Sequence, residues 1–121
     1  MKKILKTIVS KFPALLVKSI VHCALFLKLN RLAFSIALNA KLPSQLKTIS
    51  IKTFDVMLQN DGSSLIRLAY YLGADHIEPG ELKLWKDLCQ ASNAILEIGG
   101  NIGLYAVIGS KATNGNYTAY E

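Results

Sequence analysis

The feature that most restricts the fold is a strand–turn–helix–strand pattern at the C-terminal end of the chain. Residues 94–98 form a continuous apolar run with one acid, residues 99–103 are rich in glycine, and residues 104–112 have a helical pattern. A second strand pattern occupies residues 117–121. Strands joined through a helix pair in parallel and cross over with a right hand. We therefore expect one βαβ unit, with its first strand buried on both faces.

Upstream of this unit the pattern predicts a β-hairpin and then a helix. Apolar and polar residues alternate over residues 48–58, with one slip near Thr53, which is strand periodicity. Residues 60–63, Asn-Asp-Gly-Ser, form a turn signal, and residues 65–71 are a second apolar and aromatic run. We expect these two runs to form the arms of the hairpin. Glu-Pro-Gly-Glu at residues 78–81 is typical of a helix start.

The N-terminal part has a different composition. Up to Lys52 the chain has ten Lys or Arg and no Asp or Glu, and all eight acids follow. Apolar residues recur at helical spacing to about residue 40, with a break or a new first turn at Pro13. No uncharged stretch in this part is longer than residues 19–27, which is far shorter than the roughly 20 residues that a membrane span needs. Lysines also interrupt any signal-peptide core. We expect a helical segment over residues 1–47 and a domain over residues 48–121.

The N-terminal helices have two explanations. Most amphipathic helices bury their apolar stripe against the rest of the protein, and we expect this here. The alternative is contact with an anionic membrane surface, which would be peripheral and released by salt. We expect a cytoplasmic protein, with any membrane contact of this peripheral kind.

The cysteines and histidines indicate no special chemistry. Cys23 and Cys89 lie among apolar residues without a CxxC partner, as small core residues do in a reducing compartment. His22 and His76 have no companion at metal-ligand spacing, so we assign no metal site.

The glycine-rich turn is the candidate ligand site. Such a turn lets the backbone approach a ligand closely, and the following helix offers N–H groups to an anion. A dinucleotide site requires G-x-G-x-x-G. Here the glycines are Gly99, Gly100 and Gly103, and Asn101 stands where the second spaced glycine belongs. An NAD or nucleotide-sugar site is therefore disfavoured, and a purely structural turn is the plain alternative.

Residues 95–105, Ile-Leu-Glu-Ile-Gly-Gly-Asn-Ile-Gly-Leu-Tyr, resemble the signature of the FkbM-type methyltransferases. That signature has an acid, a Gly-Ala-Asn-Ile-Gly core and then an aromatic residue. The Glu78–Pro79 pair before a leucine-rich helix is also similar to this family. The departures are Glu97 where Asp is commoner and Gly100 where Ala is commoner. The resemblance covers about residues 54–121.

This resemblance implies a Rossmann-like class I fold with S-adenosylmethionine as cofactor. Glu97 would hydrogen-bond the ammonium or water network of the methionine moiety, and Gly99 and Gly103 would give the loop clearance. Glu121, at the end of the next predicted strand, is in the usual place for an acid that accepts from both ribose hydroxyls. The implied cofactor-binding residues are Glu97, Gly99, Gly100, Asn101, Gly103 and Glu121. No catalytic residue is implied, and Glu78 has either a capping or a cofactor-side role.

The implied reaction is O-methylation of a small-molecule or glycan acceptor, such as a sugar, glycolipid or secondary-metabolite hydroxyl. Class I enzymes have a larger, mostly parallel sheet. We therefore expect this chain to be a truncated fragment that lacks the acceptor site and is inactive alone. The alternative is a non-catalytic protein, truncated or associated with a membrane surface. Nucleic-acid binding is disfavoured, because the N-terminal cations are interleaved with apolar residues and lack aromatic stacking partners.

Overall fold

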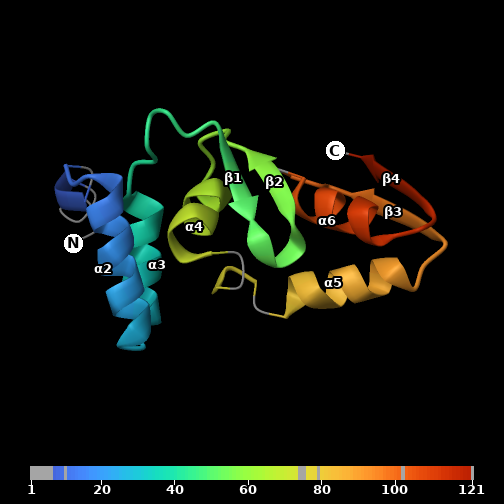
Figure 1. Ribbon diagram of the computed structural model, residues 1–121, viewed down its shortest axis with the longest axis horizontal. Coiled ribbons are helices and arrows are strands. Elements are labelled where there is room, and N and C mark those ends of the chain that lie inside the picture. The colour runs from blue at the N-terminus through green and yellow to red at the C-terminus, as the bar shows by residue number, and fades with distance from the viewer. Residues whose placement is uncertain (1–6, 10, 74–75, 79, 102, 121) are drawn as a thin grey trace. The chain divides into compact units, whose positions relative to one another are not determined.

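A computed structural model describes residues 7–9, 11–73, 76–78, 80–101 and 103–120. These residues form a mixed α/β protein with two small sheets (Figure 1). The chain divides into two compact units, one of residues 1–49 and 59–77 and the other of residues 50–58 and 78–121. The α/β class is as predicted, whereas the finer assignment to a Rossmann-like sheet remains a proposal.

The first unit is built on helices α2 (Ala14–Phe26) and α3 (Asn30–Asn39), which lie side by side in Figure 1. Helix α2 begins directly after Pro13, as predicted from the sequence. The two helices are joined by a short turn in which Lys28 has a φ of 58°. Each buries small and branched residues at helical spacing, namely Val17, Val21, Ala24, Ala33, Ile36 and Ala37. The predicted N-terminal helices are therefore confirmed over the described residues.

Residues 64–72 correct the predicted hairpin, because they form helix α4 (Ser64–Leu72) rather than a strand. The local reason is an N-terminal cap. The Ser63 hydroxyl accepts a hydrogen bond from the Ile66 N–H at 3.3 Å, and the Asp61 carboxylate accepts one from the Ser63 N–H at 2.8 Å. The tertiary reason is burial, since Leu68, Tyr71 and Leu72 join the core made by α2 and α3.

The β-hairpin is made instead within residues 48–59. Strands β1 (Thr48–Ile51) and β2 (Val56–Gln59) pair with each other, and a short 3-10 turn, η1 (Lys52–Phe54), connects them. The slip near Thr53 therefore marks the turn. Asp55 closes it in the left-handed region, with a φ of 51°. Each strand alternates buried and exposed residues, which explains why the periodicity was readable in the sequence.

The second unit contains the predicted βαβ arrangement. After α5 (Glu81–Gln90) come β3 (Ala94–Ile98), α6 (Leu104–Ala112) and β4 (Asn116–Tyr120). Strands β3 and β4 are parallel neighbours, with Ile95 opposite Tyr117 and Glu97 opposite Ala119. The predicted pairing is confirmed.

Burial of β3 on both faces is contradicted. Leu96 is 62% exposed and Ile98 is 80% exposed. The other face of the sheet is covered by helices. Trp85 and Cys89 from α5 and Gly109 from α6 gather around the side chain of Tyr117. Both helices therefore cover the same side of the sheet.

Among the described residues, no helix is both long enough and apolar enough to cross a membrane.

Tyr71 provides a test of the first unit's core. Its side chain is fully buried, and its hydroxyl donates to the Lys41 carbonyl at 2.5 Å. Tyr71→Phe leaves that carbonyl without its donor, so the free energy of unfolding should fall by about 1–3 kcal/mol. Urea denaturation followed by far-UV circular dichroism measures this. Tyr70→Phe is the matched control, because it keeps the Tyr71 hydrogen bond, and an equal loss in both variants would contradict the assignment.

The same residue predicts a dependence on alkaline pH. Burial, and to a smaller extent the neighbouring Tyr70, raises the pKa of Tyr71 from 10.0 to about 12. The folded state therefore holds a proton that the unfolded state releases above pH 10. This contribution to stability is complete below pH 10 and should be lost as pH rises toward about 12. Denaturation series at several pH values should show a shallower decline in Tyr71→Phe than in the wild type.

Candidate functional site

The glycine-rich loop between β3 and α6 has a backbone that few residue types adopt. Gly99 has a φ of 80°, Asn101 of 49° and Gly103 of 78°. Left-handed backbone is costly for residues with a Cβ, except for Asn and Asp, which tolerate it best. The residues at these positions are therefore those that the turn requires. Ile102 lies outside the described residues.

Backbone hydrogen bonds close this loop onto the sheet and the helix. The Gly99 N–H donates to the Tyr120 carbonyl at 2.7 Å, and the Gly103 N–H donates to the Gly100 carbonyl at 2.8 Å. The Gly103 carbonyl in turn accepts from the Val107 N–H at 2.9 Å, which starts α6. The first N–H groups of a helix have no partner within it. The loop therefore presents the positive end of α6 next to the end of β3.

The space in front of the loop is open. A Cβ placed on Gly99 or Gly103 would meet no atom within 4 Å. A Cβ on Gly100 would lie 3.3 Å from Oε1 of Glu97. Gly99 and Gly103 are thus dictated by backbone conformation, and Gly100 gives the Glu97 carboxylate room beside the loop.

Glu97 is held by a partner that the sequence did not indicate. Its Oε2 accepts a hydrogen bond from the Tyr117 hydroxyl, while its Oε1 lies near Gly100. Burial raises the pKa of Tyr117, and the bond to Glu97 raises it further. One oxygen of the carboxylate is therefore anchored to β4, and the other is beside the loop. The parallel register explains the contact, because residue 117 lies opposite residue 95 and faces the same side of the sheet as residue 97.

Helix α6 packs tightly against Tyr117, the residue that binds Glu97. A Cβ on Gly109 would come within 3.0 Å of the Cys89 sulfur and closer still to the Trp85 and Tyr117 rings. Cys89 is almost completely buried, as predicted for a core residue. Burial, followed by the nearby charge of Glu97, raises the pKa of its thiol. This thiol is therefore protonated and packed, and it is not an activated nucleophile.

A second carboxylate–tyrosine contact supports the start of α6. The Tyr105 hydroxyl donates to Oε2 of Glu78 at 2.5 Å and lies 3.5 Å from Oε2 of Glu81. Trp85 donates from Nε1 to the Tyr105 carbonyl at 2.9 Å, and the two rings meet edge to face. Burial, then the bond to Glu78, raises the pKa of Tyr105.

Glu78 therefore has a structural partner on α6. The N-terminal position of α5 is taken by Gly80, and no side chain caps it, so the capping role considered for Glu78 is not observed. The contact joins two parts of the sequence resemblance, the acid before α5 and the aromatic residue after the loop, that are 27 positions apart.

The predicted cofactor residues fall into two groups. Glu97, Gly99, Gly100, Asn101 and Gly103 lie together on one strand end and its loop. Glu121 lies outside the described residues, so its ribose contact stays a prediction. Tyr117, Tyr105 and Glu78 complete the site as residues that position others. No protein-family model, curated protein or solved structure matches this chain.

Gly109 gives a test of this packing. Gly109→Ala gains helix propensity worth roughly 1 kcal/mol. We expect this gain to be outweighed, because the new methyl group overlaps the Tyr117 and Trp85 rings and the Cys89 sulfur. The free energy of unfolding should fall by about 1–2 kcal/mol overall. Ser110→Ala, at an exposed position of the same helix, is the control and should change stability little. Thermal and urea denaturation measure both, and a stabilised Gly109→Ala variant would contradict the packing.

Proposed function

We propose that this chain carries the S-adenosylmethionine-binding part of a class I methyltransferase of FkbM type. The observation that carries the proposal is the position of Glu97. Its carboxylate stands at the end of a parallel strand, beside a left-handed loop that opens onto the first turn of α6. Ligands of open parallel sheets bind at this edge, outside the carboxyl ends of the strands.

The residues present fit the amino-acid end of this cofactor. Oε1 of Glu97, the oxygen not bonded to Tyr117, would accept from the methionine ammonium. The N–H groups at the start of α6 would face its carboxylate. Gly99 and Gly103 leave open space where the ligand would lie. Glu121 would accept from the ribose hydroxyls.

When bound, S-adenosylmethionine would supply a sulfonium methyl group for in-line transfer to an acceptor oxygen. The protein's contribution to such a transfer is mainly position and orientation. In this chain, Tyr117 would serve as a positioning residue, because its hydroxyl fixes the carboxylate of Glu97. The acceptor implied by the family resemblance is a hydroxyl of a sugar, glycolipid or secondary metabolite.

Binding of NAD at the same loop is a weaker proposal. A dinucleotide places its pyrophosphate over the second glycine of the fingerprint, where the backbone must be bare. Asn101 occupies that place here, in a left-handed conformation that carries a Cβ and an amide. A cofactor without a pyrophosphate avoids this conflict.

The test is calorimetric titration of S-adenosylhomocysteine into the complete natural protein that contains these residues. Glu121→Ala should weaken binding roughly tenfold to a hundredfold, since a charge-assisted hydrogen bond is worth about 1.5–3 kcal/mol. Glu97→Gln keeps the shape but removes the charge, and should cost a comparable amount. Gly99→Val should be worse than either, because a β-branched residue resists a positive φ and fills the ligand space.

Asp87→Asn is the matched control, since it removes one exposed carboxylate from α5 and should leave the affinity unchanged. Unchanged affinity in Glu121→Ala would remove the ribose assignment alone. Tighter binding of NAD than of S-adenosylhomocysteine by the wild type would contradict the proposed function as a whole.

A further inference from the structure

Helix α2 carries two apolar stripes, and the core uses one of them. Val17, Val21 and Ala24 are buried against α3 and α4. A second set of apolar residues lies on the other side of the helix and is exposed to solvent. We define this outer face of α2 as Leu15, Leu16, Ile20 and Phe26, together with Phe12 and Leu27, which lie just outside the two ends of the helix.

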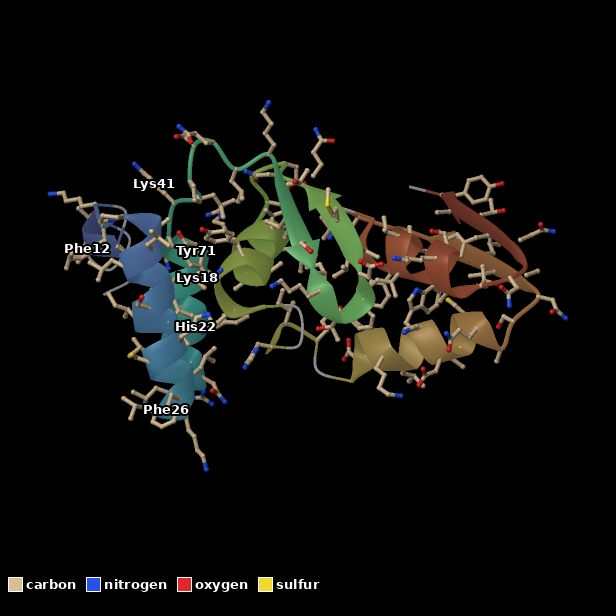
Figure 2. All side chains as sticks on the ribbon, in the orientation of Figure 1. Phe12, Lys18, His22, Phe26, Lys41 and Tyr71 are labelled. Atoms are coloured by element: carbon tan, nitrogen blue, oxygen red, sulfur yellow. The ribbon has the colours of Figure 1, made fainter. Side chains whose placement is uncertain are left out.

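The outer face is exposed along the length of the helix, most strongly at Leu15 and Phe26. Leu15 is 78% exposed and Phe26 is 87% exposed. Phe12 and Phe26 are labelled near the two ends of α2 in Figure 2. Contiguous apolar surface of this kind is uncommon on a soluble monomer and marks a surface that contacts something else.

Positive charge borders this apolar surface. Lys18 and His22 are four positions apart on α2, so they lie on one edge of the helix, and Lys11 is exposed just before its start. Lys18 also lies over the Tyr70 ring, 4.6 Å from its centroid, which fixes its place on that edge. Lys28 and Arg31 are exposed beyond the end of α2. No acid occurs anywhere in the first 52 residues to balance these cations.

We propose that the outer face of α2 docks on an anionic lipid bilayer. The helix would lie along the surface, with its apolar side chains at the boundary of headgroups and acyl chains and its cations among the lipid phosphates. The 13 residues of α2 span only about 20 Å, less than the roughly 30 Å of a hydrocarbon core. This inference is independent of the proposed methyl transfer.

Charge selects a membrane over a second copy of the chain. A symmetric dimer through the outer face would bring two acid-free, basic segments together, and like charges across an interface are unfavourable. An anionic bilayer offers both an apolar layer and the opposite charge. The two features of the surface are thus satisfied by one partner.

The test is flotation of the 121-residue chain with lipid vesicles. Vesicles of 30% phosphatidylglycerol in phosphatidylcholine should bind the protein at least tenfold more tightly than phosphatidylcholine alone, at about 1 kcal/mol per lysine or arginine near the surface. High salt should reduce binding to the level of the neutral vesicles. Absence of binding to the anionic vesicles would overturn the proposal.

Two double variants separate the apolar and the charged contributions. Leu15→Gln with Phe26→Gln should lower affinity at least tenfold for anionic vesicles. Lys11→Gln with Lys28→Gln should also lower it about tenfold, and should leave the weak binding to neutral vesicles unchanged. Circular dichroism melting checks that both variants fold, which is expected because the four side chains are exposed.

Matched controls lie in the second unit. Met57→Gln with Leu84→Gln removes two apolar side chains that are 64% and 59% exposed, and Lys52→Gln with Lys86→Gln removes two charges. Losses as large as those in the α2 variants would show that binding is nonspecific and would overturn the proposal. Sedimentation velocity without lipid provides a further check. A dimer that Leu15→Gln with Phe26→Gln dissociates would assign the outer face to a second copy instead.

Discussion

The left-handed backbone at Gly99, Asn101 and Gly103 is the constraint on which the second unit depends. Strand β3 can lie parallel to β4 only if the chain leaves the sheet, crosses over through α6 and returns. A short turn achieves this when several of its residues take positive φ. The same conformation directs the first N–H groups of α6 toward the end of β3. The turn that makes the parallel pair thereby also makes the candidate site.

Two carboxylate–tyrosine hydrogen bonds stabilise the elements before and after that turn. Tyr117 on β4 binds Glu97, and Tyr105 on α6 binds Glu78. Both hydroxyls are partly buried, so each needs a partner, and a carboxylate is a strong acceptor. The first bond fixes the acid beside the loop, and the second fixes the helix after it. Each acid therefore has a tyrosine partner, and Glu97 in addition has an oxygen beside the loop.

The two apolar stripes of α2 show why hydrophobicity alone does not assign a residue to a core. Val21 and Phe26 are both apolar and lie on the same helix, yet Val21 is fully buried and Phe26 is largely exposed. The difference is whether α3 and α4 cover that side of the helix. The same holds for β3, where Ile95 is half-buried and Ile98 is exposed. Burial depends on which elements pack there, and that information is not local.

The sequence by itself determined the elements whose signals are local. The helical spacing after Pro13, the alternation from Ile49 to Leu58 and the strand–glycine–helix succession each follow from short-range geometry. Tertiary burial, together with a local cap, decided the state of residues 65–71, whose apolar and aromatic composition suits a strand or a helix. There the Ser63 cap and burial of Tyr71 against α2 and α3 favour the helix. Tertiary structure also determined the partners of Glu97 and Glu78. Glu97 is 20 positions from Tyr117 and Glu78 is 27 positions from Tyr105, so only folding brings each pair within hydrogen-bond distance.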